Sequence, residues 1–169
     1  MMRRVFLAVL VFVTMSPVPN ATGQQATPRL FDHYERICDE NEKARLDFLA
    51  IELMNDPEAR VYIVTYGGRC YSNCMIDYPR HRRQFPRKAL EQAWGSRIKQ
   101  YLVEVRGMDA ARIVAVEGGH RESWEAELWI VPEGAPKPPL SPTLKPEDIV
   151  YKKGKVTQRE LRAGCAKKS

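Results

Sequence analysis

The residues best suited to chemistry in this chain are its four cysteines, Cys38, Cys70, Cys74 and Cys165. In an oxidising compartment, four cysteines most simply form two disulfides, and three pairings are possible. The order of the predicted elements brings Cys38, Cys70 and Cys74 to the same end of one sheet. This favours Cys70–Cys74 or Cys38–Cys74 without deciding between them. Either bridge would fix a long irregular loop.

The alternative chemistry for these cysteines is metal binding or redox exchange. Cys70 and Cys74 stand in the order Cys-Tyr-Ser-Asn-Cys, a spacing found in some exported copper-handling proteins, and His81 and His120 could complete a site. Such a site needs reduced thiols. A thiol-based copper-binding or redox protein is therefore the alternative function, and counting free thiols separates it from the disulfide-bonded protein. Taken singly, His81 and His120 are interpreted as exposed loop residues, while His33 precedes the first helix and has no recognisable partner pattern.

Catalytic motifs are missing from the sequence. It contains no glycine-framed serine, no HExxH and no phosphate-binding glycine loop. Glu125 and Glu127 alternate with core positions, so we interpret them as the solvated face of an edge strand. We assign Trp94, Trp124 and Trp129 to the core or to a sheet face. The sequence therefore predicts a protein that is not an enzyme and uses no metal or other cofactor.

The net charge of +6 names no partner by itself, but the basic residues are clustered. One cluster consists of Arg80, Arg82, Arg83, Arg87 and Lys88, and another of Lys152, Lys153, Lys155, Arg159, Arg162, Lys167 and Lys168. Such clusters are usually solvated loops. The partner they favour is an anionic polymer of the cell envelope, while nucleic acid is a less favoured one.

The elements that position these residues are organised around the segment 61–66. It is β-branched or aromatic throughout, which predicts a strand buried on both faces, and it stops at Gly67-Gly68. A short strand at Leu30-Phe31 precedes it. Between them, a helix from Glu42 carries leucines at helical spacing, with Asp39 or Asn41 as its cap, and ends at 55–57. This order predicts a right-handed crossover between two paired parallel strands.

The second half predicts a helix over 90–105 that stops at Gly107, then a strand over 112–116 and a turn at Gly118-Gly119. A last strand over 124–131 alternates cleanly, so we expect it to run antiparallel at a less buried position. Six apolar residues on the inner faces of these elements should be buried together: Leu46, Leu53, Ile63, Ile98, Leu102 and Leu128.

The two ends of the chain differ from the middle. Residues 1–23 have the layout of a secretory signal peptide, with Arg3 and Arg4 before a short apolar run, so the mature chain should be periplasmic or secreted and carry no transmembrane segment. The domain then spans 24–132. Residues 133–146 form a proline-rich extended connector, and 147–169 a basic tail with few apolar anchors, which we expect to be dispensable for folding.

Tyr101-Leu102, followed by the run from Arg106 to Ile113, resembles the helix end and third-strand entry of the OmpA-like C-terminal domain. The strand end at 65–68, with its paired glycines, and the Gly118-Gly119 pair fit the same family. The resemblance covers about 30–132. It implies an α/β (α+β) two-layer sandwich with the order β-α-β-α-β-β, in a periplasmic module whose known members bind peptidoglycan.

The resemblance also implies a pocket where an aspartate and an arginine pair with the charged groups of diaminopimelate. Gly68 stands where the aspartate is expected and Trp94 where the arginine is expected, so both partners are absent. Arg69 and Arg97 could recreate a carboxylate site, and Asp77 could supply the negative charge. We therefore expect an exported, non-catalytic binding or structural protein of the cell envelope, whose contact with peptidoglycan or another anionic envelope polymer is weak and driven by charge.

Overall fold

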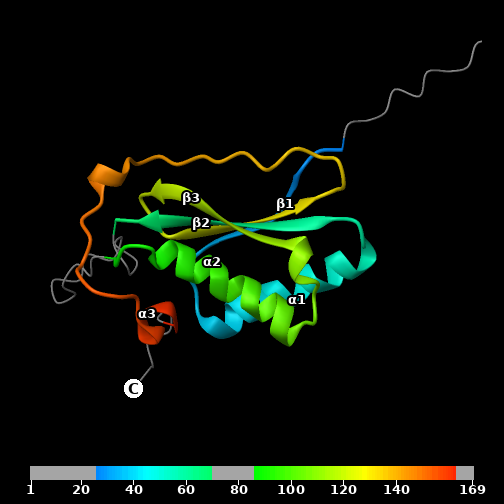
Figure 1. Cartoon of the computed structure of the whole chain (residues 1–169), viewed down its shortest axis with the longest axis horizontal. Helices are drawn as coiled ribbons and strands as arrows, with labels where there is room; N and C mark the ends of the chain where they lie inside the picture. Colours follow the sequence, from blue (N-terminus) through cyan, green and yellow to red (C-terminus); the bar gives the residue numbers. More distant parts are fainter. Residues whose placement is uncertain (1–25, 70–85, 163–169) are drawn as a thin grey trace, which may run out of the picture.

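The computed structural model of this chain describes residues 26–69 and 86–162 (Figure 1). Its strands are β1 (Arg29–Glu35), β2 (Arg60–Gly68), β3 (Ile113–Arg121) and β4 (Glu125–Val131). Its α-helices are α1 (Asp39–Asn55), α2 (Leu90–Gln100) and the short α3 (Gln158–Arg162). A π-helical turn (Tyr101–Val105) extends α2, and 3-10 turns occupy Ala110–Arg112 and Pro146–Asp148. None of the helices in these ranges is long and apolar enough to cross a membrane.

The strands form one mixed sheet in the order β1-β4-β2-β3. β2 pairs with β3 in parallel, while β4 runs antiparallel to both β1 and β2. The predicted pairing of the first two strands is therefore wrong, because β4 lies between them, although they run in the same direction. The last strand is antiparallel as predicted. Its predicted position was wrong, because β4 is an inner strand with a neighbour on each side.

Helices α1 and α2 cover one face of this sheet (Figure 1). The main core lies between the two layers, and all six residues predicted to be buried together belong to it. β2 is buried along its length except at Arg60, which confirms the central strand that the sequence predicts. The protein is thus a mixed α+β fold in which two helices pack on a four-stranded sheet.

The ends of the helices follow the sequence signals unevenly. α1 begins at Asp39, with Cys38 at its N-cap and no capping hydrogen bond from that side chain, so the predicted start at Glu42 was wrong by almost one turn. Its end at Asn55 agrees with the prediction. Gly107 follows the second helix with a φ of 67°, a backbone conformation that glycine adopts without strain.

Gly118 and Gly119 do not form the predicted turn, because both lie within β3. The pairing of β2 with β3 shifts register here, between Thr65 and Tyr66. A Cβ atom at Gly118 would lie 2.5 Å from the ring of Tyr66. Glycine at this position therefore allows β3 to lie close to the aromatic ring of Tyr66.

The proline-rich segment covers the second face of the sheet. It runs along the side opposite to α1 and α2 (Figure 1). The N–H of Ser141 donates to the Tyr66 hydroxyl at 3.2 Å, and Leu144 forms a single antiparallel bridge with His120. Val64 and Tyr66, which face this segment, are completely buried. The connector is extended as predicted, and it also closes the fold.

The tail also contacts the body. Ile149 is only 6% exposed, and Val156 and Leu161 pack against the core. The N–H of Lys152 donates to the carbonyl of Pro86 at 2.8 Å. These contacts correct the expectation that the tail has few apolar anchors. The predicted boundaries at residues 132 and 146 stay predictions.

We predict that Leu102→Ala lowers the free energy of unfolding by about 2–5 kcal/mol, because it empties a fully buried site between helix and sheet. The control is Val105→Ala on the same π-helical turn, where the side chain is exposed. Denaturant unfolding monitored by circular dichroism measures both. Equal effects of the two substitutions would contradict the described packing of this turn.

We also predict that truncation after Pro132 lowers the melting temperature strongly or abolishes cooperative melting. The truncation uncovers Val64 and Tyr66 and removes the buried Ile149, and burying one large apolar side chain contributes about 1.5–3 kcal/mol. Thermal melts of the full and shortened chains, both oxidised, test this. A cooperative melt within a few degrees of the full chain would restore the original expectation that the tail is dispensable.

Candidate functional site

The described members of the predicted ligand site meet at one end of the sheet, where β1 and β2 stop and α1 begins. Gly68 ends β2, and Arg69 follows it. Trp94 lies on α2, and Arg97 lies one helical turn further along. Asp77 lies outside the described residues. This end is the region in which the family resemblance implies the ligand pocket.

The position of Gly68 has no room for a side chain. A Cβ atom there would lie 2.7 Å from the backbone of Ser123 and Trp124 and from the indole of Trp124. The ring centroids of Trp94 and Trp124 lie 6.5 Å apart, and that of Tyr34 lies 6.3 Å from Trp94. Aromatic packing therefore fills the space next to Gly68, and the core assignment of Trp94 and Trp124 is confirmed.

Trp94 makes a buried polar contact that the sequence did not predict. Its indole N–H donates to Oε1 of Glu42 at 2.6 Å, and both residues are at most 2% exposed. Arg97 donates to the other oxygen of Glu42 and, at 2.5 Å, to Asp39. The guanidinium of Arg97 is therefore held by two carboxylates of α1. The predicted carboxylate receptor is satisfied from within the protein.

The pKa values at this end of the sheet reflect burial and pairing. Burial raises the pKa of Glu42, although Arg97 and the indole of Trp94 act in the opposite direction. The pKa of Asp39 is lowered, chiefly by its hydrogen bond with Lys43, and the charge of Arg97 adds to this effect. A buried carboxylate whose pKa is raised depends on its partners to remain ionised.

Sequence reasoning missed Glu42 because it placed the helix start at this residue. The signal was its spacing, since Glu42 precedes the buried Leu46, Leu49 and Leu53 at helical intervals and therefore lies on the apolar face of α1. A groove of about 380 Å³ continues from this carboxylate between α1 and α2. Its lining includes Asp39, Glu42, Arg97, Tyr101 and Glu104.

Arg69 offers little to a ligand. It forms an exposed ion pair with Glu122 at 3.1 Å, and the backbone groups of the two residues are also hydrogen-bonded. Exposed pairs of this kind contribute about 0–1 kcal/mol. Both described arginines that were predicted to bind a ligand, Arg69 and Arg97, are paired with carboxylates of the protein itself.

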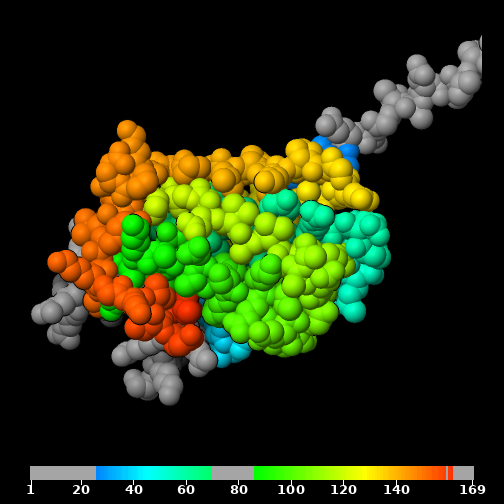
Figure 2. Space-filling model, in the orientation of Figure 1, coloured from blue at the N-terminus to red at the C-terminus, as the bar shows by residue number. Residues whose placement is uncertain are grey.

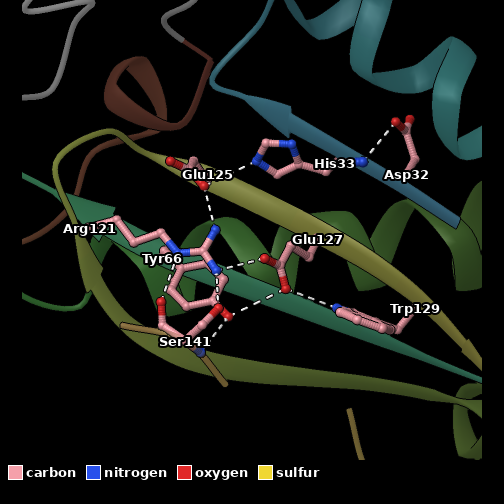
Figure 3. Close-up of polar contacts among 8 residues, drawn as sticks. All are labelled: Asp32, His33, Tyr66, Arg121, Glu125, Glu127, Trp129 and Ser141. Carbon is pink, nitrogen blue, oxygen red and sulfur yellow. Dashed lines mark hydrogen bonds and ion pairs between the residues drawn. The ribbon is translucent and has the colours of Figure 1, made fainter. Parts of the chain in front are cut away.

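A second polar cluster lies on the opposite face of the sheet, under the connector (Figure 3). The carboxylate of Glu127 accepts hydrogen bonds from Arg121 at 2.7 Å, from the indole of Trp129 at 2.9 Å and from the hydroxyl of Tyr66 at 3.4 Å. Arg121 also donates to Ser141 of the connector. This network ties the connector to the sheet.

The prediction that Glu125 and Glu127 form a solvated face was therefore wrong. Their alternation with the core positions is real, but β4 is an inner strand and the connector covers its second face. Glu127 is buried, while Glu125 pairs with Arg121 at 2.5 Å and with His33 at 3.1 Å. His33, for which the sequence shows no recognisable partner pattern, lies in β1.

Glu91, His120 and Tyr151 meet near the ends of β2 and β3. The hydroxyl of Tyr151 lies 2.6 Å from Nε2 of His120, and Oε1 of Glu91 lies 4.0 Å from the same nitrogen. Burial raises the pKa of Glu91. The prediction of an exposed loop position for His120 was wrong, since it is a partly buried residue of β3 that anchors the tail.

The residues of the predicted basic surface differ in their exposure to solvent. Arg87 was predicted to be part of a basic surface, but it is largely buried and pairs with Glu160. Lys88 is exposed, while Arg80, Arg82 and Arg83 lie outside the described residues. An isolated parallel bridge joins Arg87 to Lys152. This bridge places the start of the α2 segment directly beside the basic tail (Figure 2).

Cys38 is disulfide-bonded, and the other cysteines lie outside the described residues, as does His81. The pairing of the cysteines and the alternative copper or redox site at Cys70 and Cys74 therefore stay predictions. The signal peptide at 1–23 also lies outside the described residues. Neither a protein-family model nor a curated protein matches this chain.

We predict that Arg97→Gln destabilises the fold by about 3–5 kcal/mol at neutral pH, because the ionised Glu42 is left buried without its cation. The pKa of Glu42 is higher in the folded protein than in the unfolded chain. The folded protein therefore loses stability as the pH rises above about 4.3, the ordinary pKa of glutamate. The cost of the substitution should therefore be smaller at pH 4.5 than at pH 7.5. Urea unfolding at both pH values measures it.

The control for this prediction is Arg45→Gln, which breaks a more exposed ion pair with Asp32 at 2.7 Å. We expect a cost below about 1 kcal/mol for this control. If Arg97→Gln has the same small cost at both pH values, Glu42 does not depend on Arg97.

Proposed function

We propose that this protein is an exported, non-catalytic component of the cell envelope, built on an OmpA-like domain, that makes weak, charge-driven contact with peptidoglycan or another anionic envelope polymer. The single observation that carries the proposal is the bridge between Arg87 and Lys152, because it joins two basic segments that lie far apart in the sequence.

The joined segments form a lysine surface, defined here as Lys88, Lys152, Lys153 and Lys155. All these residues are exposed. The neighbouring acidic residue Glu160 is neutralised by Arg87. In the described part of the chain, the lysines of this surface make no ion pair of their own. Their charge is therefore available to an external polyanion.

Side chains of the protein itself occupy the end of the sheet where the ligand pocket is expected. This supports charge-driven contact in preference to binding in a specific pocket. Gly68 has no space for the expected carboxylate, Trp94 is buried, and Arg97 is engaged by Glu42 and Asp39. A diaminopimelate site needs both a free anion and a free cation at this end. Removing one member of a desolvated charge pair typically costs about 2–5 kcal/mol of binding.

The element order supports the family part of the proposal. The chain runs strand, helix, strand, helix, strand, strand, which is the order that the resemblance of the Tyr101–Ile113 region implies. The Tyr101-Leu102 pair stands at the end of the second helix, and Ile113 opens β3. These are the positions in which the resemblance places both strings.

We predict that purified sacculi retain the oxidised protein at low salt and release it at high salt, because the Debye length falls from about 10 Å at 0.1 M to about 3 Å at 1 M. The double variant Lys152→Ala/Lys153→Ala should bind several-fold more weakly, since each exposed pair is worth about 0.2–1 kcal/mol. The charge-matched control is Arg60→Ala/Lys137→Ala, which changes exposed cations elsewhere.

A sedimentation assay with a salt series measures all three proteins. Retention at 1 M salt together with competition by free diaminopimelate would show a specific pocket and overturn the proposal. If the two double variants lose binding to sacculi equally, the lysine surface is not the site of contact.

A further inference from the structure

The tail is held to the body on both sides of its lysines. On one side, the hydroxyl of Tyr151 is hydrogen-bonded to His120 at 2.6 Å. On the other side, the carboxylate of Glu160 accepts from Nε of Arg87 at 2.8 and 2.9 Å, and Arg36 donates to the backbone carbonyl of Glu160. The segment that carries Lys152, Lys153 and Lys155 is thus anchored at two separate points of the body.

Arg87 is the centre of the second anchor. Its side chain and that of Glu160 are only 15% and 18% exposed, so their ion pair is better shielded from solvent than a surface pair. Arg87 also donates to the carbonyl of Lys153 and pairs through its backbone with Lys152. One arginine therefore contacts the lysine segment and the helix that follows it.

Glu160 is fixed from its own side as well. It forms a reciprocal cap with Thr157, whose N–H donates to the carboxylate at 2.9 Å, while the N–H of Glu160 donates to the Thr157 hydroxyl at 3.3 Å. Burial alone would raise the pKa of Glu160, but the hydrogen bonds from Thr157 and Arg87 bring it below its usual value. The carboxylate is therefore ionised at neutral pH.

Gly154 lets the tail pass over Arg87. It has a φ of 106°, which side-chain-bearing residues rarely adopt. A Cβ atom at this position would also collide with the guanidinium of Arg87. The backbone conformation therefore favours glycine between Lys153 and Lys155, and a Cβ atom there would force the guanidinium of Arg87 to shift.

We propose that these contacts form a clamp, consisting of Arg87, Gly154, Glu160 and the Tyr151–His120 hydrogen bond, that holds Lys152, Lys153 and Lys155 in a fixed array for the repeated carboxylates of an envelope polymer. This inference rests on the proposed function and adds a mechanism to it. A fixed array loses less conformational freedom on binding than a free basic tail does. The clamp residues position the lysines and do not contact the polymer themselves.

The decisive variant is Glu160→Gln, because charge and positioning predict opposite results. It removes one negative charge beside the lysine surface and frees Arg87, so attraction alone would strengthen binding to sacculi at low salt. If the clamp matters, the variant binds about three- to ten-fold more weakly, since the array must be ordered at each binding event. The control is Glu147→Gln, which removes the same charge from an exposed position of the tail.

Gly154→Ala tests the clamp without changing any charge. It should weaken binding to a similar extent. Its control is Gly134→Ala, since Gly134 also has a positive φ of 74° but no atom near its Cβ position. Thermal melts of the four full-length variants establish that each is folded at the assay temperature.

Weaker binding by both Glu160→Gln and Gly154→Ala, with both controls unchanged or tighter, supports the clamp. Unchanged or tighter binding by Glu160→Gln overturns it, and so does unchanged binding by Gly154→Ala. If Lys152→Ala/Lys153→Ala still weakens binding in that case, the clamp alone fails. If the lysine variant binds like the wild type, the proposed function fails.

Discussion

The buried carboxylate of Glu42 sets the strictest condition on this fold. Ionised carboxylates are rarely removed from water without partners, because their desolvation costs several kcal/mol. Glu42 is only 2% exposed and is satisfied by the indole of Trp94 and the guanidinium of Arg97. Both partners come from α2. This contact therefore joins the start of α1 to α2 and fixes the end of the sheet at which they meet.

The same contact limits what that end of the sheet can bind. A receptor for a ligand with both charges needs an anion and a cation that are free before binding. Here, Arg97 already lies between Glu42 and Asp39, and the aromatic rings of Trp94 and Trp124 fill the neighbouring space. The proposed lysine surface lies elsewhere, where the tail passes the start of α2.

The connector and the tail belong to the fold together with the four strands and the helices α1 and α2. The connector covers the second face of the sheet through Ser141 and the network around Glu127 and Arg121. The tail continues across the end of the sheet and is held by His120 and Arg87. Segments that are poor in regular secondary structure thus provide both a cover and a charged surface.

The sequence by itself determined the order of the four strands and the two long helices, together with the main core. These features depend on local periodicity and backbone preference, which act within a few residues. They are the apolar run of β2, the helical spacing of the apolar residues around Leu46 and around Leu102, and the end of the second helix at Gly107. The sequence also indicated that Gly68 and Trp94 cannot supply the charges of the expected ligand site.

Only the tertiary structure decided that β4 enters the sheet between β1 and β2. Because β4 is an inner strand covered by the connector, Glu127 is buried and not solvated as expected. The tertiary structure also decided that Arg87 pairs with Glu160 and that Glu42 meets Arg97, because contacts between residues more than fifty positions apart depend on how the layers pack and leave no local pattern in the sequence.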